Sequence, residues 1–427
     1  MGMHRVRAEA HSHHAASAIW TIARDFAAPW HPWVTKMWVE PAQNGQLVRA
    51  LRVDGDSTVY RERQTWFSDS LREYGYSHLS GIEGVQDYNG KLQVLTDGTG
   101  ARVVMEATLT AQEPRASDIA KGTQAVFDAG VAALAALKAP GQASPPVVSN
   151  AGVLDELRIT SDPAIALTCA GQSCDTACLF LHGIGGGRSN WDQQLRAAAP
   201  HMRAAAMDLR GYGDSTLGPN QTTVEDHSND ILRAAQALGS KRLVLCGLSF
   251  GAWIATSFAM RHPERLAGLI LSGGCTGMSE ATEETRNGFR ESREGPLDAG
   301  LTPADFADGV IQIIAAPDSS AEVREALHRS MAAIPVATYR DALRCFTTPP
   351  EKFDFSRLTM PVLMMTGAHD RLAPPAEIES VARRIHAAQA LPDVRFERLD
   401  GAGHVCNLDR PDLYNAAMTE FLRRVAQ

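Results

Sequence analysis

The sequence has few cysteines, no long apolar run and no surplus of basic residues. Its seven cysteines are an odd number spread over 427 residues, which does not suit a disulfide framework, so reduced thiols are expected. Cys169, Cys174 and Cys178 lie close together, but their segment supplies no fourth ligand at the spacing of a zinc site. The sequence therefore predicts no bound metal, and nothing in it calls for a cofactor.

The absence of a long apolar run and of a surplus of positive charge disfavours membrane and nucleic-acid partners. No run approaches roughly 18 apolar residues, and the stretch Met1 to His14 is polar and His-rich, without the apolar core of a secretion signal. The net charge of -8 and the pI near 6.0 give no basic field that would attract a phosphate backbone or an anionic bilayer. We expect a cytoplasmic protein without such partners, and whether it forms a homo-oligomer stays open.

The composition is that of an ordinary globular protein, and the length favours two domains. Hydrophobic residues make up 44% and charged residues 21% of the chain. A stretch rich in Pro, Ser and Gly without apolar periodicity, residues 139–150, is typical of a linker. It divides the chain into a domain at 1–138 and a larger one at 151–427.

The two parts differ in their hydrophobic patterns. Before the linker, Thr58 to Phe67 and Ala101 to Thr110 alternate as half-buried strands do, and Ile119 to Leu137 has helical spacing, which predicts an α+β domain. After it, short apolar runs alternate with helical stretches, which predicts a mostly parallel sheet with helices on both faces. These runs are Ala177 to Leu181, Ala204 to Met207, Leu243 to Cys246, Leu269 to Leu271 and Val362 to Met365.

The strongest local signal is a G-x-S-x-G turn at Gly247 to Gly251. An apolar strand runs into it and a helix follows, which is the context in which this motif carries a nucleophile. Side chains at the two glycines would collide with the neighbouring strand or helix, and Ser249 in between is presented beside a helix N-terminus. Ser249 is therefore the predicted nucleophile, and the amide of Phe250 is one predicted donor to an oxyanion.

A second oxyanion donor is expected from the loop that follows an earlier strand. The sequence Leu179-Phe-Leu-His-Gly-Ile-Gly-Gly-Gly187 supplies such a loop, and the amide of Ile184, with Gly185 next, is the predicted donor. His182 and Gly183 are expected to lie beside the substrate. A histidine at this position more often holds the loop than takes part in the chemistry.

A base and an orienting acid follow in the chain order that such a serine requires. Asp370 comes just after the apolar run that ends at Met365, and His404 stands in a Gly-rich loop after a later strand. A serine hydroxyl needs an imidazole base, and the imidazole needs a carboxylate to fix its tautomer, so His404 and Asp370 are assigned these roles. His369 is offset by one residue, and Asp208 precedes the serine, so neither is preferred.

These motifs together resemble the α/β-hydrolase superfamily over about two-thirds of the chain. Within it, Gly247 to Gly251 and the Gly403-His404 ending look most like the 3-oxoadipate enol-lactonase and esterase group, although that group usually has Met and Gly where this chain has Phe250 and Ala252. The resemblance implies an α/β-hydrolase fold, with a helical cap at about 276–356. Ser249 at the centre of the G-x-S-x-G turn disfavours haloalkane dehalogenases, whose nucleophile is an aspartate.

The first part is similar to the helix-grip, Bet v 1-like fold of polyketide cyclases. The similarity rests on the aromatic segment Ile19 to Trp33, the strands after it and the long helix that ends the domain. In that fold a long helix closes over a curved sheet and can leave an apolar cavity. Trp20, Trp30, Trp33 and Trp66 are candidates to line it, although large rings are more often plain core.

The expected reaction is cleavage of a small-molecule carboxylic ester or lactone through an acyl-enzyme on Ser249. A C–C bond hydrolase or perhydrolase with the same triad, and a ligand-binding or cyclase-like role led by the first domain, stay open. Four arginines of the insertion are candidates to bind a substrate carboxylate, as an enol-lactone would need: Arg286, Arg290, Arg340 and Arg344. Other expected substrate contacts are Trp253, Met278 and Val405.

Overall fold

The computed structural model describes residues 2–40, 46–136, 154–349 and 352–426, so the predicted linker at 139–150 lies outside the described residues. The described residues form two compact units. The first contains those up to residue 136 and the short segment Leu391–Phe396, and the second contains 154–390 and 397–426. All seven cysteines carry free thiols.

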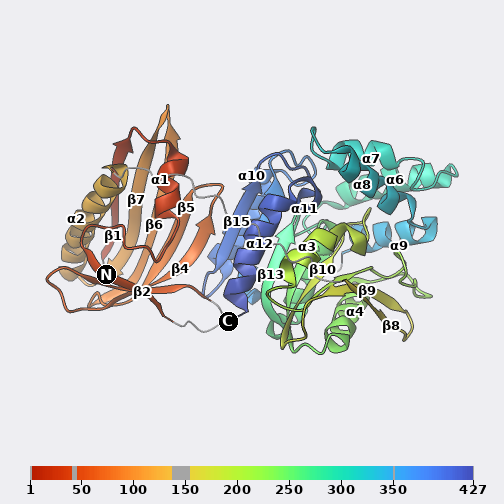
Figure 1. Ribbon diagram of the computed structural model, residues 1–427, viewed down its shortest axis with the longest axis horizontal. Helices are drawn as coiled ribbons and strands as arrows, with labels where there is room; N and C mark the ends of the chain where they lie inside the picture. Colours follow the sequence, from red (N-terminus) through yellow and green to blue (C-terminus); the bar gives the residue numbers. More distant parts are fainter. Residues whose placement is uncertain (1, 41–45, 137–153, 350–351, 427) are drawn as a thin grey trace. The chain divides into compact units, whose positions relative to one another are not determined.

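The first unit is an antiparallel sheet with a long helix at its C-terminal end (Figure 1). The strands follow the order β1-β7-β6-β5-β4-β3-β2, and each pairs antiparallel with its neighbour. This is the helix-grip arrangement that the sequence predicted. Its elements are β1 (Gly2–Ser12), α1 (Ala16–Ala23), β2 (Val34–Glu40), β3 (Val48–Val53), β4 (Tyr60–Ser68), β5 (Glu73–Ser80), β6 (Val85–Asp97), β7 (Gly100–Ala111) and α2 (Arg115–Ala136).

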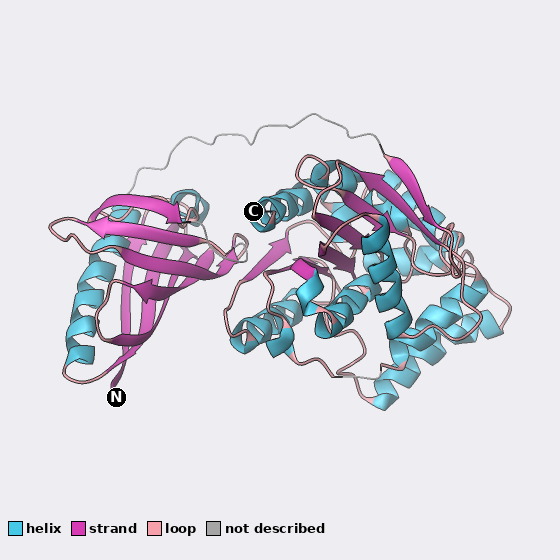
Figure 2. Cartoon of the chain, turned by 90° about the horizontal axis from the view of Figure 1, so that it is seen from below, coloured by secondary structure: helices cyan, strands magenta, loops and turns pink. Residues whose placement is uncertain are grey.

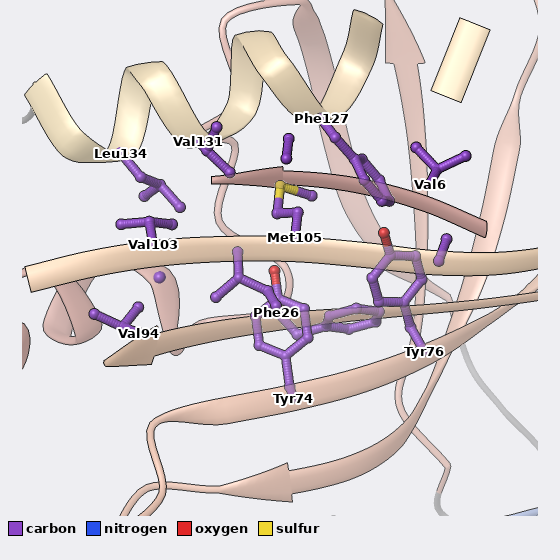
Figure 3. Close-up of a cluster of buried hydrophobic side chains, with 14 of the residues drawn as sticks. Val6, Phe26, Tyr74, Tyr76, Val94, Val103, Met105, Phe127, Val131 and Leu134 are labelled. Carbon is purple, nitrogen blue, oxygen red and sulfur yellow. The ribbon is translucent and has the colours of Figure 1, made fainter. Parts of the chain in front are cut away.

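The core of this unit lies between the sheet and α2. Figure 3 shows Phe127, Val131 and Leu134 of α2 pointing toward the sheet, where Val103 and Met105 of β7 meet them. The same figure shows side chains from neighbouring strands closing the layer from below. Burial of this continuous apolar layer is the main force that keeps the helix on the sheet.

The tryptophans of this unit have different environments. Trp20 is buried in the core and donates a hydrogen bond from Nε1 to Asp69 at 2.7 Å, and Trp30 packs against the core at its edge. Trp66 is also buried, but Nε1 donates to the Glu73 carboxylate at 2.7 Å. Trp33 is 40% exposed and does not belong to the buried core.

The second unit is built on a mostly parallel sheet, as predicted. The strand order is β8-β9-β11-β10-β12-β13-β14-β15, in which β11, β10, β12, β13 and β14 run parallel and the edge strands β8 and β9 pair antiparallel. Every residue of β11 to β14 is buried except the first of β12, which explains their continuous apolar runs. The strands are β8 (Asp155–Ile159), β9 (Ile165–Ala170), β10 (Thr176–Leu181), β11 (Ala204–Met207), β12 (Arg242–Leu248), β13 (Leu266–Ser272), β14 (Val362–Gly367) and β15 (Val394–Leu399). Of β15, residues 397–399 belong to this unit.

Helices cover both faces of this sheet (Figure 2). They are α3 (Asp192–Ala198), α4 (Val224–Ala237), α5 (Phe250–Arg261), α10 (Pro375–Ala388), α11 (Cys406–Asp409) and α12 (Pro411–Val425). Between β13 and β14 the chain forms the predicted helical insertion, made of α6 (Glu283–Asp298), α7 (Ala307–Ile314), α8 (Ala321–Ala332) and α9 (Val336–Thr347). Among the described helices, none combines the length and the hydropathy that crossing a bilayer requires.

Candidate active site

The predicted catalytic residues follow strands of the second sheet. Ser249 comes directly after β12, Asp370 follows β14, and His404 lies in the loop after β15. His182 comes directly after β10, the parallel neighbour of β12. The carboxyl ends of parallel strands meet at one edge of a sheet, where ligand sites of such folds form. The topology therefore gathers residues that are far apart in the sequence.

Ser249 stands in a strained turn between β12 and α5. Its φ of 55° and ψ of -115° lie where side chains are rarely found, and its amide donates a hydrogen bond to the Ser272 carbonyl at 2.8 Å. The flanking glycines allow the close packing of this turn. A Cβ at Gly251 would lie 2.3 Å from the Leu181 carbonyl oxygen, and one at Gly247 would lie 2.3 Å from the carbonyl oxygen of Gly251.

His404 and Asp370 form a buried hydrogen-bonded pair. Nδ1 of His404 is 2.9 Å from Oδ2 of Asp370, and the two side chains are almost fully buried. The other carboxylate oxygen, Oδ1, accepts hydrogen bonds from the amides of Leu372 and Ala373, each at 2.9 Å. The backbone of His404 is fixed as well, because its amide donates to the Ile314 carbonyl at 2.7 Å. The pair therefore holds the imidazole in one orientation and one tautomer.

The chain just after β13 contacts both the imidazole and the serine. A Cβ placed on Gly273 would lie 3.1 Å from Cε1 and Nδ1 of His404, and one on Gly274 would lie 3.8 Å from Cα of Ser249. Ser249 and His404 also line the same cavity. The structure thus brings Ser249, His404 and Asp370 into one neighbourhood, with the imidazole between the carboxylate and the cavity.

The loop after β10 is held by His182. Its Nδ1 lies 2.7 Å from the Gly183 carbonyl, and its Nε2 accepts a hydrogen bond from the Leu209 amide at 3.1 Å. Nδ1 faces a carbonyl and Nε2 accepts a hydrogen bond, so the ring is neutral and carries its proton on Nδ1. Burial lowers the pKa of His182, which also favours the neutral form. Because the peptide is planar and trans, the amide of Ile184 points opposite to the carbonyl that His182 fixes. His182 thus orients a predicted oxyanion donor.

The other predicted oxyanion donors are positioned in similar ways. The hydroxyl of Tyr212 donates to the Ile184 carbonyl at 2.9 Å, which fixes the peptide that carries the Gly185 amide. Phe250 is the first residue of α5, where an amide has no intrahelical partner and the helix dipole favours negative charge. Within the described part of the chain, the amides of Ile184, Gly185 and Phe250 donate no hydrogen bond to a protein group, so all three are free to bind an oxyanion.

Ser249 opens into a cavity of about 420 Å³. Of the predicted substrate contacts, His182, Gly183, Met278 and Val405 line it, together with Ile184, Gly185 and Phe250. The insertion supplies much of the rest of the wall, and nearly all of its contributions are apolar. They include Phe289, Val310, Ile313, Ile314, Leu327, Met331 and Phe346.

Three predicted substrate contacts are not among the residues that line this cavity. Trp253 is fully buried behind Phe250, stacked on its ring at a centroid distance of 5.8 Å. Arg344 pairs with Glu294, with Nε 2.9 Å from Oε1, and Arg290 donates to the side chain of a neighbour in its own helix. These predictions are corrected: the arginines already have partners on the insertion, and the indole packs in the core.

The arginines at the cavity are residues that the sequence did not single out. Arg293 of α6 and Arg371, next to Asp370, both line the cavity, whereas Arg286 and Arg340 do not. Helical periodicity marks which residues share one face of α6, but it does not say which part of that face meets the cavity. No local signal in the sequence separates Arg293 from Arg290.

Asp208 and His369, the two residues that were not preferred for the triad, have other surroundings in the structure. Asp208 is buried and accepts hydrogen bonds from the amides of Arg188 at 2.8 Å and Asp214 at 3.1 Å, and it also pairs with the Arg188 guanidinium. It therefore stabilises the turn that follows β11, as expected. The side chain of His369 is exposed and makes no described hydrogen bond to Ser249 or Asp370.

Comparison with known proteins identifies the family of the second unit. Residues 177–411, more than half of the chain, match the family described as alpha/beta hydrolase fold. The chain belongs to the α/β-hydrolase family. Residues 3–138 of this α/β-hydrolase match a second family, described as polyketide cyclase / dehydrase and lipid transport. The predicted fusion of a hydrolase to a Bet v 1-like domain is thus confirmed.

Similar proteins share the hydrolase fold but differ in their named reactions. This α/β-hydrolase is 23% identical over 266 residues to 3-oxoadipate enol-lactonase 2 of Acinetobacter baylyi, covering 62% of this chain and 94% of that one. It is 28% identical over 258 residues to a protein of Enterobacter cloacae provisionally named carbamate hydrolase RutD, covering 56% and 88%. A thermophilic esterase of Thermogutta terrifontis superposes with a TM-score of 0.56 and 27% identity, covering 64% and 100%. These relatives support a hydrolase and leave its substrate open.

Proposed function

We propose that this α/β-hydrolase cleaves a carboxylic ester or lactone by a Ser-His-Asp acyl-enzyme mechanism. One observation carries the proposal: a serine in a positive-φ turn shares a cavity with an imidazole that is hydrogen-bonded to a buried carboxylate at 2.9 Å. A neutral alcohol becomes a nucleophile when an oriented base removes its proton, and such an arrangement meets that need.

The proposed reaction has two halves. Ser249 Oγ attacks the carbonyl carbon and gives its proton to Nε2 of His404, while Asp370 holds Nδ1–H and stabilises the imidazolium. The oxyanion accepts hydrogen bonds from the amides of Phe250 and Ile184. His404 then protonates the leaving oxygen, so that the alcohol of an ester departs or the ring of a lactone opens with its hydroxyl still attached to the acyl group. A water molecule that the same imidazole deprotonates then attacks the acyl-enzyme, releases the acid and regenerates Ser249.

Replacing the nucleophile tests the proposal. Ser249→Ala should lower kcat/KM on a 4-nitrophenyl ester by about 10⁴- to 10⁶-fold, because only binding and the oxyanion donors remain. A fluorophosphonate should label the unchanged protein at Ser249 and leave the variant unlabelled. Ser356→Ala, an exposed position, serves as the control and should keep both properties. Ester turnover that survives in Ser249→Ala would defeat the assignment.

The class of bond is tested with the same protein. A panel of aryl esters, lactones and β-diketones, with hydrogen peroxide as an alternative acceptor, compares ester hydrolysis with C–C cleavage and perhydrolysis. The proposal expects the highest Ser249-dependent kcat/KM on an ester or a lactone. A higher value on a β-diketone would replace it with C–C bond hydrolysis, because the same three residues serve both reactions.

A further inference from the structure

A cation stands in the otherwise apolar wall that α6 contributes to the cavity. Arg293 is half-buried there, and its guanidinium carbon lies 3.5 Å from the centroid of the Phe289 ring. Among the described residues no carboxylate forms an ion pair with it. The adjacent Glu294 is directed to other cations, with Oε1 2.9 Å from Arg344 and 3.9 Å from Arg340.

Packing on its own helix accounts for only part of this side chain. Arg293 donates from Nη1 to the Phe289 carbonyl and to Ser292 Oγ, each at 3.1 Å, and these bonds leave its other nitrogens without a described acceptor. An arginine has five N–H donors and keeps its charge in proteins, although burial lowers the pKa of Arg293. A half-buried charge without a counter-ion is unfavourable, and an anion in the cavity would remove that cost.

A second hydrogen-bond donor lines the same cavity as this cation. Tyr339 of α9 lines the same cavity and is 2% exposed. Burial raises the pKa of Tyr339, and the positive charge of Arg293 opposes that rise. Within the described residues the Tyr339 hydroxyl has no hydrogen-bond partner. A guanidinium and a phenol hydroxyl together suit a carboxylate.

Aromatic rings connect this pair with the nucleophile. The ring of Phe250, next to Ser249, lies 5.6 Å from that of Phe346, which lies 5.9 Å from that of Phe289, against which Arg293 is stacked. All three rings line the cavity. A ligand that reaches from Ser249 to Arg293 therefore passes an apolar wall, so the part between its two polar ends is apolar.

We propose that Arg293, assisted by the Tyr339 hydroxyl, binds a carboxylate at the far end of the substrate, so that the substrate is an ester or lactone whose apolar chain ends in a carboxylate. This inference rests on the proposed function of Ser249. It assigns specificity to two residues of the insertion and leaves the chemistry of the ester bond to the triad.

Paired substrates test the proposal on the full chain. One series is the mono-4-nitrophenyl esters of straight-chain dicarboxylic acids of increasing length, and the matched series carries a primary amide in place of the free carboxylate. The unchanged protein should prefer the carboxylate by tenfold or more at one chain length. Arg293→Gln should lower kcat/KM for the carboxylate ester by about 10- to 100-fold and change the amide ester by less than about threefold, as expected for a lost charge-assisted hydrogen bond.

Companion variants separate recognition from structure. Arg293→Lys should retain part of the preference, because the charge stays and the bidentate geometry is lost, and Tyr339→Phe should reduce it several-fold. Arg329→Gln is the matched control, since this arginine of α8 is exposed and paired with Glu325 at 2.8 Å. An equal loss on both esters in Arg293→Gln would mean a structural role and would overturn the proposal. A preference lost only in Arg371→Gln would overturn it too.

The two proposals fail in different ways. If ester turnover persists in Ser249→Ala, the proposed chemistry is wrong, whatever the selectivity. If turnover depends on Ser249 and Arg293→Gln keeps the preference for the carboxylate, only the substrate class is wrong. Binding of a straight-chain dicarboxylate to Ser249→Ala, measured by calorimetry with and without Arg293→Gln, gives a readout that needs no turnover and should weaken by about tenfold in the double variant.

Discussion

The backbone around Ser249 shows how single atoms determine the shape of the turn that carries the proposed nucleophile. A non-glycine residue at a φ of 55° costs on the order of 1–3 kcal/mol, and such strain persists only where the surroundings fix the conformation. Here the amide of Ser249 is held by the Ser272 carbonyl, and Gly251 lets α5 approach β10. The turn therefore depends on the absence of a Cβ at Gly251.

Gly251→Ala should both destabilise the protein and inactivate it. The new methyl group would meet the Leu181 carbonyl oxygen at 2.3 Å, so α5 must shift, at a cost of about 2–4 kcal/mol in the free energy of unfolding. Urea unfolding and ester kinetics measure the two effects. Gly288→Ala, in an exposed part of α6 with open space around Cα, should instead be neutral or stabilising by about 0.5–1 kcal/mol. Equal stability of the two variants would contradict this account.

Buried histidines make the stability depend on pH, and His227 is the clearest case. It is 2% exposed, its ring meets that of Phe250 edge-on, and burial followed by the charge of Arg210 lowers its pKa to about 3. In the unfolded chain a histidine titrates near about 6.5. Below that pH the unfolded state binds a proton that the folded state does not, so stability falls as the pH decreases from about 6.5 toward 3.

His227→Gln should flatten that dependence. Over the range from pH 6.5 to 4.5 the unchanged protein should lose up to about 1.4 kcal/mol of unfolding free energy per pH unit more than the variant does. The comparison of slopes holds whatever the variant's stability at neutral pH. His328→Gln, at a histidine of α8 whose side chain is 44% exposed, is the control substitution. Parallel curves for the unchanged protein and His227→Gln would show that this histidine does not titrate in the way described.

Among the elements, α11 connects the His404 loop with the insertion. The carboxylate of Asp409, the last residue of α11, accepts hydrogen bonds from the amides of Gly403 at 2.8 Å and Ala316 at 3.0 Å, and also from the Ser319 hydroxyl. Two of these groups belong to the segment between α7 and α8. One carboxylate therefore fixes both the loop that carries the imidazole and part of the cavity wall.

Asp409→Ala should uncouple these segments. Two amides and a hydroxyl lose their acceptor, which should cost about 2–3 kcal/mol in unfolding free energy, and a looser His404 should lower kcat by about 10-fold or more. Asp412→Ala removes a mostly exposed carboxylate paired with Arg410 and should cost less than about 1 kcal/mol with unchanged kcat. An Asp409→Ala variant that keeps full kcat would show that the loop carrying His404 is fixed without the Asp409 carboxylate.

At the scale of the whole molecule, the two units each have a separate apolar core. The core of the first is a cluster drawn from its own sheet, α1 and α2, and that of the second lies around the parallel sheet. A unit with its own core can unfold as a cooperative unit. The proposed catalytic residues all belong to the second unit.

Core substitutions in the two units should therefore have separable effects on the full chain. Phe127→Ala in α2 and Phe421→Ala in α12 each remove a ring that is at most 1% exposed, at a cost of about 3–5 kcal/mol. Calorimetry should show a different transition shifting in each variant. Ester turnover at 25 °C should stay unchanged in Phe127→Ala and should lose its thermal tolerance in Phe421→Ala. A shift of both transitions by either variant would mean that the chain unfolds as one unit.

The sequence by itself determined the Ser249 turn, the order of the candidate triad residues and the type of sheet, because each depends on neighbouring residues or on chain order. The turn at Ser249 needs small neighbours and a strand before it, so its motif could be recognised from a few adjacent residues. Asp370 and His404 were predicted from their chain order and from the strands before them, which is a topological rule of such sheets. The alternation of apolar runs and helices predicted the mostly parallel sheet of the second unit for the same reason.

Only the tertiary structure decided which side chains of the insertion meet the cavity. Arg290 and Arg293 stand on the same helix three residues apart, yet only Arg293 lines the cavity, and Trp253 lies behind the ring of Phe250. The sequence fixes the helical period, whereas the rotation of α6 about its axis depends on packing with elements distant in the chain. Long-range packing, which no local pattern records, therefore selects which arginine of α6 lines the cavity.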